Sequence, residues 1–235
     1  MATPRVSAMY IVKNEREYFP FSIRSIYNVV DEVIVVDGYS TDGTVEIARS
    51  IDKVKLFFCK SEDYSVNRNL ALEKAAGEWL MPMDADMVFY DDINTVLPRL
   101  IKDPGVDVYT CWFYHLMKDY FHVQNTSDRD PLYIRNLLVR RTPDLSWVGA
   151  VHEKLVGTGP RVRDSGLFFV HYGYVKPQRE VFQRWVKYAK LEGRGEDAYA
   201  GMNPDTILDD RPLRPFTRPH PEVIQEYIQR KTGSA

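Results

Sequence analysis

The chain has 235 residues, of which 31 are Lys or Arg and 33 are Asp or Glu, so its formal net charge is −2. With 44% hydrophobic and 13% aromatic residues, it has neither the low hydrophobicity nor the high net charge of a disordered chain. It also lacks the basic excess of most nucleic-acid-binding proteins, which weakly disfavours a nucleic acid as its partner.

The N-terminus, Met1 to Arg5, is not followed by the long apolar run of a signal peptide. No stretch of the sequence reaches the roughly 18 apolar residues that span a membrane. We therefore expect no transmembrane segment and a location in the cytoplasm, with any membrane contact confined to the protein's surface. Cys59 and Cys111 have no metal-binding spacing, and we predict that both are reduced thiols in the core.

The first half of the chain alternates short apolar runs with amphipathic stretches. Near-continuous apolar residues in several of the runs predict parallel strands that are buried on both faces. A helix is predicted over 65–76, capped by Ser65 and ended by Gly77 in the left-handed conformation; Phe19, Ile23 and Ile26 mark an earlier helix. The series implies an α/β fold with a twisted parallel sheet. The predicted strands are 6–12, 32–37, 54–59, 79–83 and 106–112.

The second half of the chain has a different rhythm. Strand-like segments at 133–140 and 166–172 are separated by polar turns, which predicts mixed or antiparallel strands added to the parallel half. Helical spacing returns over 178–191. Five prolines between residues 201 and 221 exclude a long helix and predict an irregular arm.

The arm suggests a hypothesis of its own, because Arg211, Arg214 and Arg218 give it fixed positive charge, and it could close as a lid over a diphosphate. A final short helix carries Ile224, Tyr227 and Ile228 on one face and is expected to dock onto the body. We divide the chain into a main domain at 1–200 and a proline-rich arm with a C-terminal helix at 201–235. Within the main domain, residues 1–112 form the expected nucleotide-binding half and 113–200 the acceptor half.

Acidic residues follow two of the predicted parallel strands, whereas no GxxxxGK[ST] or GxGxxG phosphate motif follows any of them. Asp37 follows the second strand, and Asp84 with Asp86 follows the fourth. Two carboxylates one residue apart at the end of a buried strand repel each other unless they share a cation, which favours Mg²⁺ or Mn²⁺ bound to phosphates. The other Asp-x-Asp pair, Asp128 and Asp130, falls in a polar loop and is interpreted as a solvated turn.

Four segments resemble, in order and spacing, the family 2 glycosyltransferases of GT-A fold. They are Tyr10-Ile11-Val12-Lys13-Asn14-Glu15, Val35-Val36-Asp37-Gly38-Tyr39-Ser40-Thr41-Asp42-Gly43-Thr44, Asn67-Arg68-Asn69-Leu70-Ala71 and Met83-Asp84-Ala85-Asp86. The resemblance is close over about residues 4 to 112. It continues more loosely through 147–153 and 171–174, which resemble a subgroup related to lipopolysaccharide-core sugar transferases.

The resemblance implies a parallel-centred mixed sheet flanked by helices. It also implies an enzyme that moves a sugar from a nucleotide diphosphate sugar, such as a UDP- or GDP-sugar, to an acceptor hydroxyl on a glycan, glycolipid or other substrate. Inversion at the transferred carbon and dependence on Mn²⁺ or Mg²⁺ are expected. A nucleotidylyltransferase and a non-catalytic nucleotide-sugar-binding module remain as alternatives, although the first normally needs a glycine-rich basic loop that residues 12–15 lack.

Carried over by position, the resemblance assigns several ligand roles. For Glu15, a first-turn acid favoured by the helix dipole is an equal alternative. For the late histidine of the metal site, His171 matches better than His152, although a satisfied structural histidine is the other interpretation of each. The implied nucleotide-binding residues are Val12, Asn14, Glu15, Asp37, Arg68, Asp84 and Ala85, and the implied metal ligands are Asp84, Asp86 and His171.

The catalytic base must lie on the far side of the anomeric carbon from the departing diphosphate, because attack and departure are in line. It therefore cannot be a metal ligand. The resemblance puts the base at Glu153, for which an ion-paired acid next to Lys154 is the alternative role. The other candidates for the base are Asp128, Asp130, Asp164 and His152.

Overall fold

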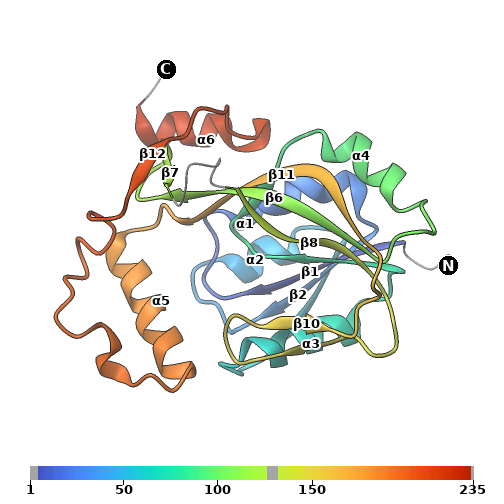
Figure 1. Cartoon of the computed structure of the whole chain (residues 1–235), viewed down its shortest axis with the longest axis horizontal. Helices are drawn as coiled ribbons and strands as arrows, with labels where there is room; N and C mark the ends of the chain where they lie inside the picture. Colours follow the sequence, from blue (N-terminus) through green and yellow to red (C-terminus); the bar gives the residue numbers. More distant parts are fainter. Residues whose placement is uncertain (1–4, 126–131, 234–235) are drawn as a thin grey trace.

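A computed structural model describes residues 5–125 and 132–233 of the chain, and a mixed sheet runs through the centre of the molecule (Figure 1). Its parallel part has the strand order β4-β1-β2-β3. Every residue of β2 and β4 is buried, which explains their near-continuous apolar sequences. The predicted parallel half is confirmed, with strands β1 (Val6–Val12), β2 (Glu32–Asp37), β3 (Val54–Phe58) and β4 (Trp79–Met83).

The strands of the second half extend the same sheet. β8 pairs antiparallel with β4 and with β6, and β6 pairs parallel with β11, so the two halves form one sheet. β6 and β11 are longer than predicted, and the expected boundary between residues 112 and 113 falls inside β6. A separate hairpin consists of β9 (Ser146–Val148) and β10 (Lys154–Val156). The other strands are β5 (Met87–Phe89), β6 (Val108–Met117), β7 (His122–Gln124), β8 (Leu132–Arg140), β11 (Val162–Tyr174) and β12 (Leu213–Pro215).

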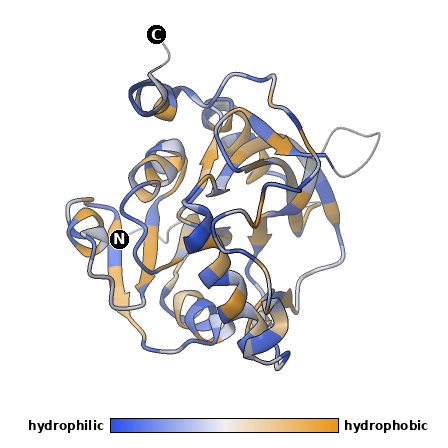
Figure 2. Cartoon of the chain, turned by 90° about the vertical axis from the view of Figure 1, so that its left-hand side faces the viewer, coloured by the Kyte–Doolittle hydropathy of each residue, from blue (hydrophilic) through white to orange (hydrophobic). Residues whose placement is uncertain are grey.

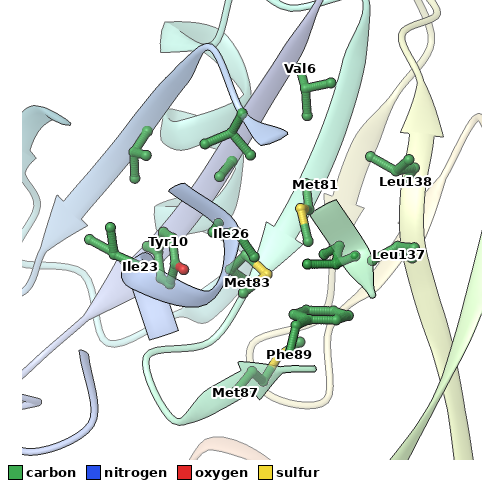
Figure 3. Close-up of a cluster of buried hydrophobic side chains, with 14 of the residues drawn as sticks. Val6, Tyr10, Ile23, Ile26, Met81, Met83, Met87, Phe89, Leu137 and Leu138 are labelled. Carbon is green, nitrogen blue, oxygen red and sulfur yellow. The ribbon is translucent and has the colours of Figure 1, made fainter. Parts of the chain in front are cut away.

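Helices cover both faces of the parallel strands. One face packs against α1 (Phe19–Ile26), α2 (Thr44–Arg49) and α4 (Ile93–Leu100), and the other packs against α3 (Tyr64–Lys74) and the β9–β10 hairpin. The alternation of strand side chains makes this possible, because Tyr10 points to the first face and Met9 to the second. Figure 3 shows the larger of these clusters, with side chains of α1 against those of β1 and β4.

The ends of α3 differ from the prediction. Its N-cap is Asp63, not Ser65, because the Asp63 carboxylate accepts the backbone N–H groups of Ser65 at 2.8 Å and Val66 at 3.3 Å. The helix ends at Lys74, and Gly77 lies beyond it. A Cβ atom at Gly77 would lie 2.5 Å from the Ser7 hydroxyl, so the glycine permits a close approach to β1 and is not a left-handed cap.

The C-terminal segments follow the expected pattern. Helix α5 (Gln178–Leu191) is confirmed. The arm at 201–221 is irregular, as predicted, apart from the short strand β12. Helix α6 (Glu222–Thr232) docks by burying Ile224 and Ile228 against a cluster that includes Tyr18 and Tyr172. Figure 2 shows hydrophobic residues gathered on the central strands, whereas the outer faces of the helices are more hydrophilic.

The two cysteines differ in burial, and the helices are short or polar. Cys111 is buried, whereas Cys59 is only half-buried because β3 ends just before it, so the prediction of two core thiols is correct only for Cys111. Within residues 5–125 and 132–233, no helix combines the length and the apolar character needed to cross a bilayer. The cytoplasmic location stays a prediction.

Candidate functional site

A cavity of about 380 Å³ lies at the carboxyl ends of the parallel strands. This is the position at which open α/β sheets bind ligands. Its walls come from the ends of β1 to β4, the start of α3, the loop of the β9–β10 hairpin, β11 and α5, which stands beyond the strand ends (Figure 1). The predicted site residues that line it are Val12, Glu15, Arg68, Asp84, Ala85, Asp86, Glu153 and His171.

Three consecutive residues of α3 organise one wall of the cavity. The Asn67 side-chain amide donates to the Ser61 carbonyl at 3.0 Å and fixes the entry to the helix. The Asn69 side chain bonds both backbone groups of Trp147, donating at 2.9 Å and accepting at 2.8 Å, and so fixes the hairpin. Arg68 between them points into the cavity, with its guanidinium 5.2 Å from the Trp147 ring.

Arg68 joins the two predicted carboxylates of this wall. Its Nε donates to Glu153 at 2.6 Å, its Nη2 to Asp84 at 2.5 Å and its Nη1 to the Met83 carbonyl at 3.1 Å. Arg135, from β8, donates to the other oxygen of Asp84 at 2.7 Å. Burial alone would raise the pKa of Asp84, but Arg68 and Arg135 outweigh it and hold that pKa well below the ordinary value. Asp84 is therefore an ionised carboxylate with both oxygens engaged.

Asp86 and His171 form the part of the site that fits a metal ion. Asp86 Oδ1 and His171 Nε2 lie 3.2 Å apart, close to the separation of about 3 Å between neighbouring ligands of an octahedral Mg²⁺-type ion. Among the described residues, Asp86 Oδ1 and His171 Nδ1 are buried without a hydrogen-bond partner. A carboxylate and an imidazole together suit Mn²⁺.

The glycine next to this pair keeps it open. A Cβ atom at Gly173 would lie 2.6 Å from both Asp86 Oδ2 and the His171 ring, so any larger residue would collide with the two side chains. In the described part of the chain, no group of three or more His, Cys, Asp or Glu side chains is arranged to hold a metal. A metal bound by Asp86 and His171 would need its other ligands from substrate oxygens and water.

Two of the expected nucleotide-binding residues do not line the cavity. The Asn14 side-chain oxygen accepts the backbone N–H of Thr41 at 2.9 Å, so this residue ties the loop after β1 to the loop after β2. Asp37 is fully buried, and its Oδ1 accepts the Ser40 backbone N–H at 2.7 Å. Its Oδ2 has no hydrogen-bond partner within residues 5–125 and 132–233. The roles predicted for both residues stay predictions.

Glu15 lines the cavity and is ion-paired to Lys176 at 2.6 Å. Burial raises the pKa of Glu15, and the pairing with Lys176 opposes this effect only in part. The pair links the first turn after β1 to the start of α5. Glu15 precedes Tyr18, the N-cap of α1, and that helix has no acid in its first turn, so the alternative of a first-turn helix acid is wrong. The role at the ribose stays a prediction.

The alternative bases and ligands lie in different places. His152 borders the cavity but is exposed and pairs with Glu192 at 3.5 Å, whereas His171 lies beside Asp86. Asp164 accepts the Trp112 indole N–H at 2.7 Å and does not line the cavity. Asp128 and Asp130 lie outside the described residues.

Several residues at or near the site were not predicted from the sequence. They are the cavity-lining basic residues Lys13, Lys60, Arg184 and Lys187, and Arg135 behind Asp84. By contrast, none of the three arginines of the arm lines the cavity: the Arg211 guanidinium lies over Trp185, and that of Arg218 over Tyr114 and Phe168. For Arg184 and Lys187, the sequence showed only that basic residues fall on the predicted helix 178–191, which does not distinguish a binding residue from a solvated one.

The charges around the cavity are unevenly paired. Among the described residues, the acids of the inner wall all face a cationic or ionisable partner: Glu15 faces Lys176, Asp84 two arginines, Glu153 Arg68 and Asp86 His171. Four basic side chains of the cavity form no ion pair with any described carboxylate, namely Lys13, Lys60, Arg184 and Lys187. Glu62 also lines the cavity, and it forms no ion pair with any cation of the described residues. Four unpaired basic side chains therefore outnumber one unpaired carboxylate and are available to an anionic ligand.

Similar proteins were found among sequences and among solved structures. A TPR repeat-containing protein of Synechococcus elongatus is 28% identical over 152 residues, which cover 65% of this chain and 36% of that protein. An uncharacterized glycosyltransferase of Rickettsia felis is 28% identical over 127 residues, covering 54% and 43% of the two chains. The SPbeta prophage-derived glycosyltransferase SunS of Bacillus subtilis is 35% identical over 89 residues, covering 37% and 21%. The chain thus spans less than half the length of these curated relatives.

The solved structure of S. aureus TarS residues 1–349 matches with a TM-score of 0.53 at 16% identity, over 87% of this chain and 69% of that one. The same protein in complex with UDP-GlcNAc matches with a TM-score of 0.52 at 17% identity, over 87% and 70%. This similarity confirms the expected GT-A fold. The sequence pattern of Glycosyl transferase family 2 matches residues 7–152, which is more than half of the chain. The protein therefore belongs to glycosyl transferase family 2.

Proposed function

We propose that this protein is a glycosyltransferase that moves a sugar from a nucleotide diphosphate sugar to an acceptor hydroxyl. The observation that carries the proposal is the cavity at the strand ends, where four basic side chains but only one carboxylate, that of Glu62, form no ion pair among the described residues. Such a site suits a diphosphate. Membership of glycosyl transferase family 2 supports the reaction class, and the UDP and UDP-GlcNAc complexes of TarS support a UDP-sugar as the first donor to test.

Glu153 is the proposed catalytic base. In the reaction, the acceptor oxygen forms a bond to the anomeric carbon as its proton passes to the Glu153 carboxylate, and the bond from that carbon to the diphosphate oxygen breaks with its electron pair. Direct displacement of this kind inverts the anomeric carbon. Glu153 lines the cavity and is held by a single bond to Arg68, which leaves its second oxygen available for the proton.

Asp86 and His171 are the proposed ligands of a divalent metal, Mn²⁺ or Mg²⁺. When bound, the ion would act as a Lewis acid and stabilise the negative charge that develops on the leaving diphosphate. Asp84 has a different proposed role. Because Arg68 and Arg135 engage both of its oxygens, it supports the metal site by positioning Arg68 and the loop that carries Asp86.

A donor panel tests the proposal against its alternatives. The protein is incubated with UDP- and GDP-sugars and Mn²⁺, and the release of free nucleoside diphosphate is followed over time. Slow release is the expected result, because glycosyltransferases without acceptor transfer their sugar to water. Pyrophosphate formation from a sugar phosphate and a nucleoside triphosphate would instead identify a nucleotidylyltransferase, and binding without turnover would identify a binding module.

The acceptor is proposed only as a class. The resemblance to lipopolysaccharide-core sugar transferases suggests a glycan or glycolipid hydroxyl, and a glycolipid would bring the protein to a membrane surface. Once a donor is known, an acceptor screen with that donor and mass detection of products tests this directly. Products that carry the sugar on a protein side chain would exclude the glycan and glycolipid class.

A further inference from the structure

Helix α5 presents two cations to the cavity from the side opposite the ends of β1 and β3. Arg184 and Lys187 lie one turn apart on α5, and both line the cavity together with Tyr188. The spacing places them on one face of the helix. Lys13 and Lys60 line the same cavity from the loops after β1 and β3, so basic groups stand on two of its walls.

Arg184 is held in place through only part of its guanidinium. Its Nη2 donates to the Gly173 carbonyl at 2.7 Å, and its planar group lies 4.7 Å from the centre of the Tyr174 ring. Its Nε is buried and has no hydrogen-bond partner in the described part of the chain. Since a buried N–H without a partner is costly, and arginine remains charged at any physiological pH, this group is suited to an anion that completes its bonding.

Lys187 is anchored by an aromatic contact, with its ammonium 5.1 Å from the centre of the Tyr64 ring. Arg179, on the same helix, is a cation with a carboxylate partner and serves as a comparison. Arg179 is exposed and bound to Asp205 at 2.5 Å, and it does not line the cavity. Arg184 and Lys187 have no such carboxylate partner among the described residues.

We propose that Arg184 and Lys187 form an anion-binding wall that contacts the diphosphate of the donor, an inference that rests on the proposed function. The position favours the diphosphate over the rest of the donor, because Arg184 donates to the carbonyl of Gly173, the residue packed against Asp86 and His171. A ligand with several negative charges next to Asp86 and Glu15 needs cations to offset their repulsion. The wall supplies such charge from the protein itself, so part of the affinity for nucleoside diphosphates persists without a divalent metal.

The test measures binding of UDP, UMP, GDP and GMP by calorimetry, first with a chelator and then with Mn²⁺. In the parent protein, the diphosphate of the matching base binds more tightly than the monophosphate. In the double variant Arg184→Gln, Lys187→Gln we expect affinity for the diphosphate to fall by about tenfold or more, both with and without metal, because bonds to charged groups are lost. Affinity for the monophosphate should stay within about threefold, because the monophosphate lacks the second phosphate of the group that the two cations are proposed to bind.

Control variants separate binding from folding. Arg179→Gln, on the same helix, should bind every nucleotide as the parent does. Lys187→Gln alone keeps the bond from Arg184 to Gly173, so it should fold and still lose part of the diphosphate preference. Arg184→Lys should bind the diphosphate more weakly than the parent but more tightly than the double variant, because it keeps the charge and loses the planar guanidinium.

The outcomes distinguish this inference from the proposed function. The parent protein could bind nucleotides while the double variant keeps the same ratio of diphosphate to monophosphate affinity. That result would contradict the anion-binding role of Arg184 and Lys187 but would not contradict the proposed transferase function. A rise in the KM for the acceptor alone would also contradict that role, and would assign the two cations to an anionic acceptor. If the parent bound none of the four nucleotides, the proposed function would fail, and the wall with it.

Discussion

At the scale of single residues, the site consists of two groups of different character. Asp84, Arg68, Glu153 and Arg135 form a continuous set of ion pairs in which no acid of the set lacks a cation. Asp86 Oδ1 and His171 Nε2 face each other at 3.2 Å, and Asp86 Oδ1 and His171 Nδ1 are buried without a hydrogen-bond partner among the described residues. The first group suits positioning and proton transfer, whereas the second suits the binding of a cation.

The base assignment predicts the effect of Glu153→Gln. The amide keeps the shape of the side chain but cannot accept a proton, so transfer should fall by about a hundredfold or more while donor binding changes little. Initial rates at saturating acceptor, together with donor affinity, check this. Asp164→Asn is the matched control, because Asp164 does not line the cavity, and it should transfer at the parent rate. Glu153→Gln activity within a few-fold of the parent would move the role to another group.

Substitutions of the two aspartates of the Asp-x-Asp pair should differ in their effects on metal-dependent binding and on stability. Asp86→Asn should weaken Mn²⁺-dependent nucleotide binding and remove nearly all turnover, with little change in thermal stability. Asp84→Asn leaves Arg68 and Arg135 without their shared partner, so it should lower the free energy of unfolding by about 1 to 3 kcal/mol, less than for a fully buried pair. Mn²⁺ titration of nucleotide binding and denaturant unfolding of both variants test this difference. Equal losses of Mn²⁺-dependent binding and of stability in the two variants would contradict it.

The sequence predicted the position of the carboxylates Asp84, Asp86 and Glu153 and of Arg68 at this site, but not that of its other cations. Asp84, Asp86 and Glu153 could be predicted because they follow recognisable segments of the family. Arg184 and Lys187 could not, because basic residues on an amphipathic helix are usually a solvated face, as Arg179 is here. Only the docking of α5 beside the cavity distinguishes them.

At the scale of elements, α3 is the part of the fold that connects sheet, hairpin and site. Its apolar face packs on β1 and β2, while its polar residues Asn67, Arg68 and Asn69 hold the loop before it, the carboxylates and the hairpin. The position of Glu153 thus depends on a helix that is 85 residues away in the sequence.

Asn69→Ala tests this dependence. The variant loses two hydrogen bonds to the Trp147 backbone, which should lower the free energy of unfolding by about 1 to 3 kcal/mol. Because the hairpin carries Glu153, kcat should fall while donor affinity changes less. Denaturant unfolding and steady-state kinetics measure both effects. Glu73→Ala, an exposed position of the same helix, is the control, and an Asn69→Ala enzyme with the parent kcat would contradict the positioning role.

Element boundaries were predicted best where burial is complete. The strands 6–12, 32–37 and 79–83 match β1, β2 and β4 because both of their faces are apolar. β6 and β11 were predicted too short, since their ends mix buried with partly exposed residues and depend on pairing with each other. The cap of α3 was misplaced because Asp63 and Ser65 are both good capping residues and only the hydrogen bonds distinguish them.

At the scale of the whole molecule, the C-terminal segment supports the strand that carries His171. Ile224 and Ile228 of α6 pack in a cluster with Tyr172 of β11 and Tyr18 of the N-terminal half, and the Tyr172 hydroxyl bonds His220 at 2.9 Å. The arm contacts the main sheet through Arg218, whose guanidinium lies over the rings of Tyr114 and Phe168. These contacts join distant parts of the chain, so no local sequence pattern predicts them.

Ile224→Ala should therefore destabilise the whole protein and not only its C-terminus. Ile224 is fully buried, so the lost contacts and the remaining cavity should cost about 2 to 4 kcal/mol. A single cooperative transition at lower denaturant concentration is expected in the variant, and Glu226→Ala on the exposed face of α6 should leave it unchanged. Separate melting of α6, with the remainder as stable as the parent, would show that the segment is an appendage.

The most direct test of the central claim is a crystal structure of the protein with UDP and Mn²⁺, with anomalous diffraction measured at the manganese edge. We expect an anomalous peak that lies between Asp86 and His171. We also expect the diphosphate to lie in the cavity, with the loops after β1 and β3 on one side and the face of α5 that carries Arg184 on the other. A nucleotide bound elsewhere on the surface, with the strand-end cavity empty of both nucleotide and metal, would contradict the central claim.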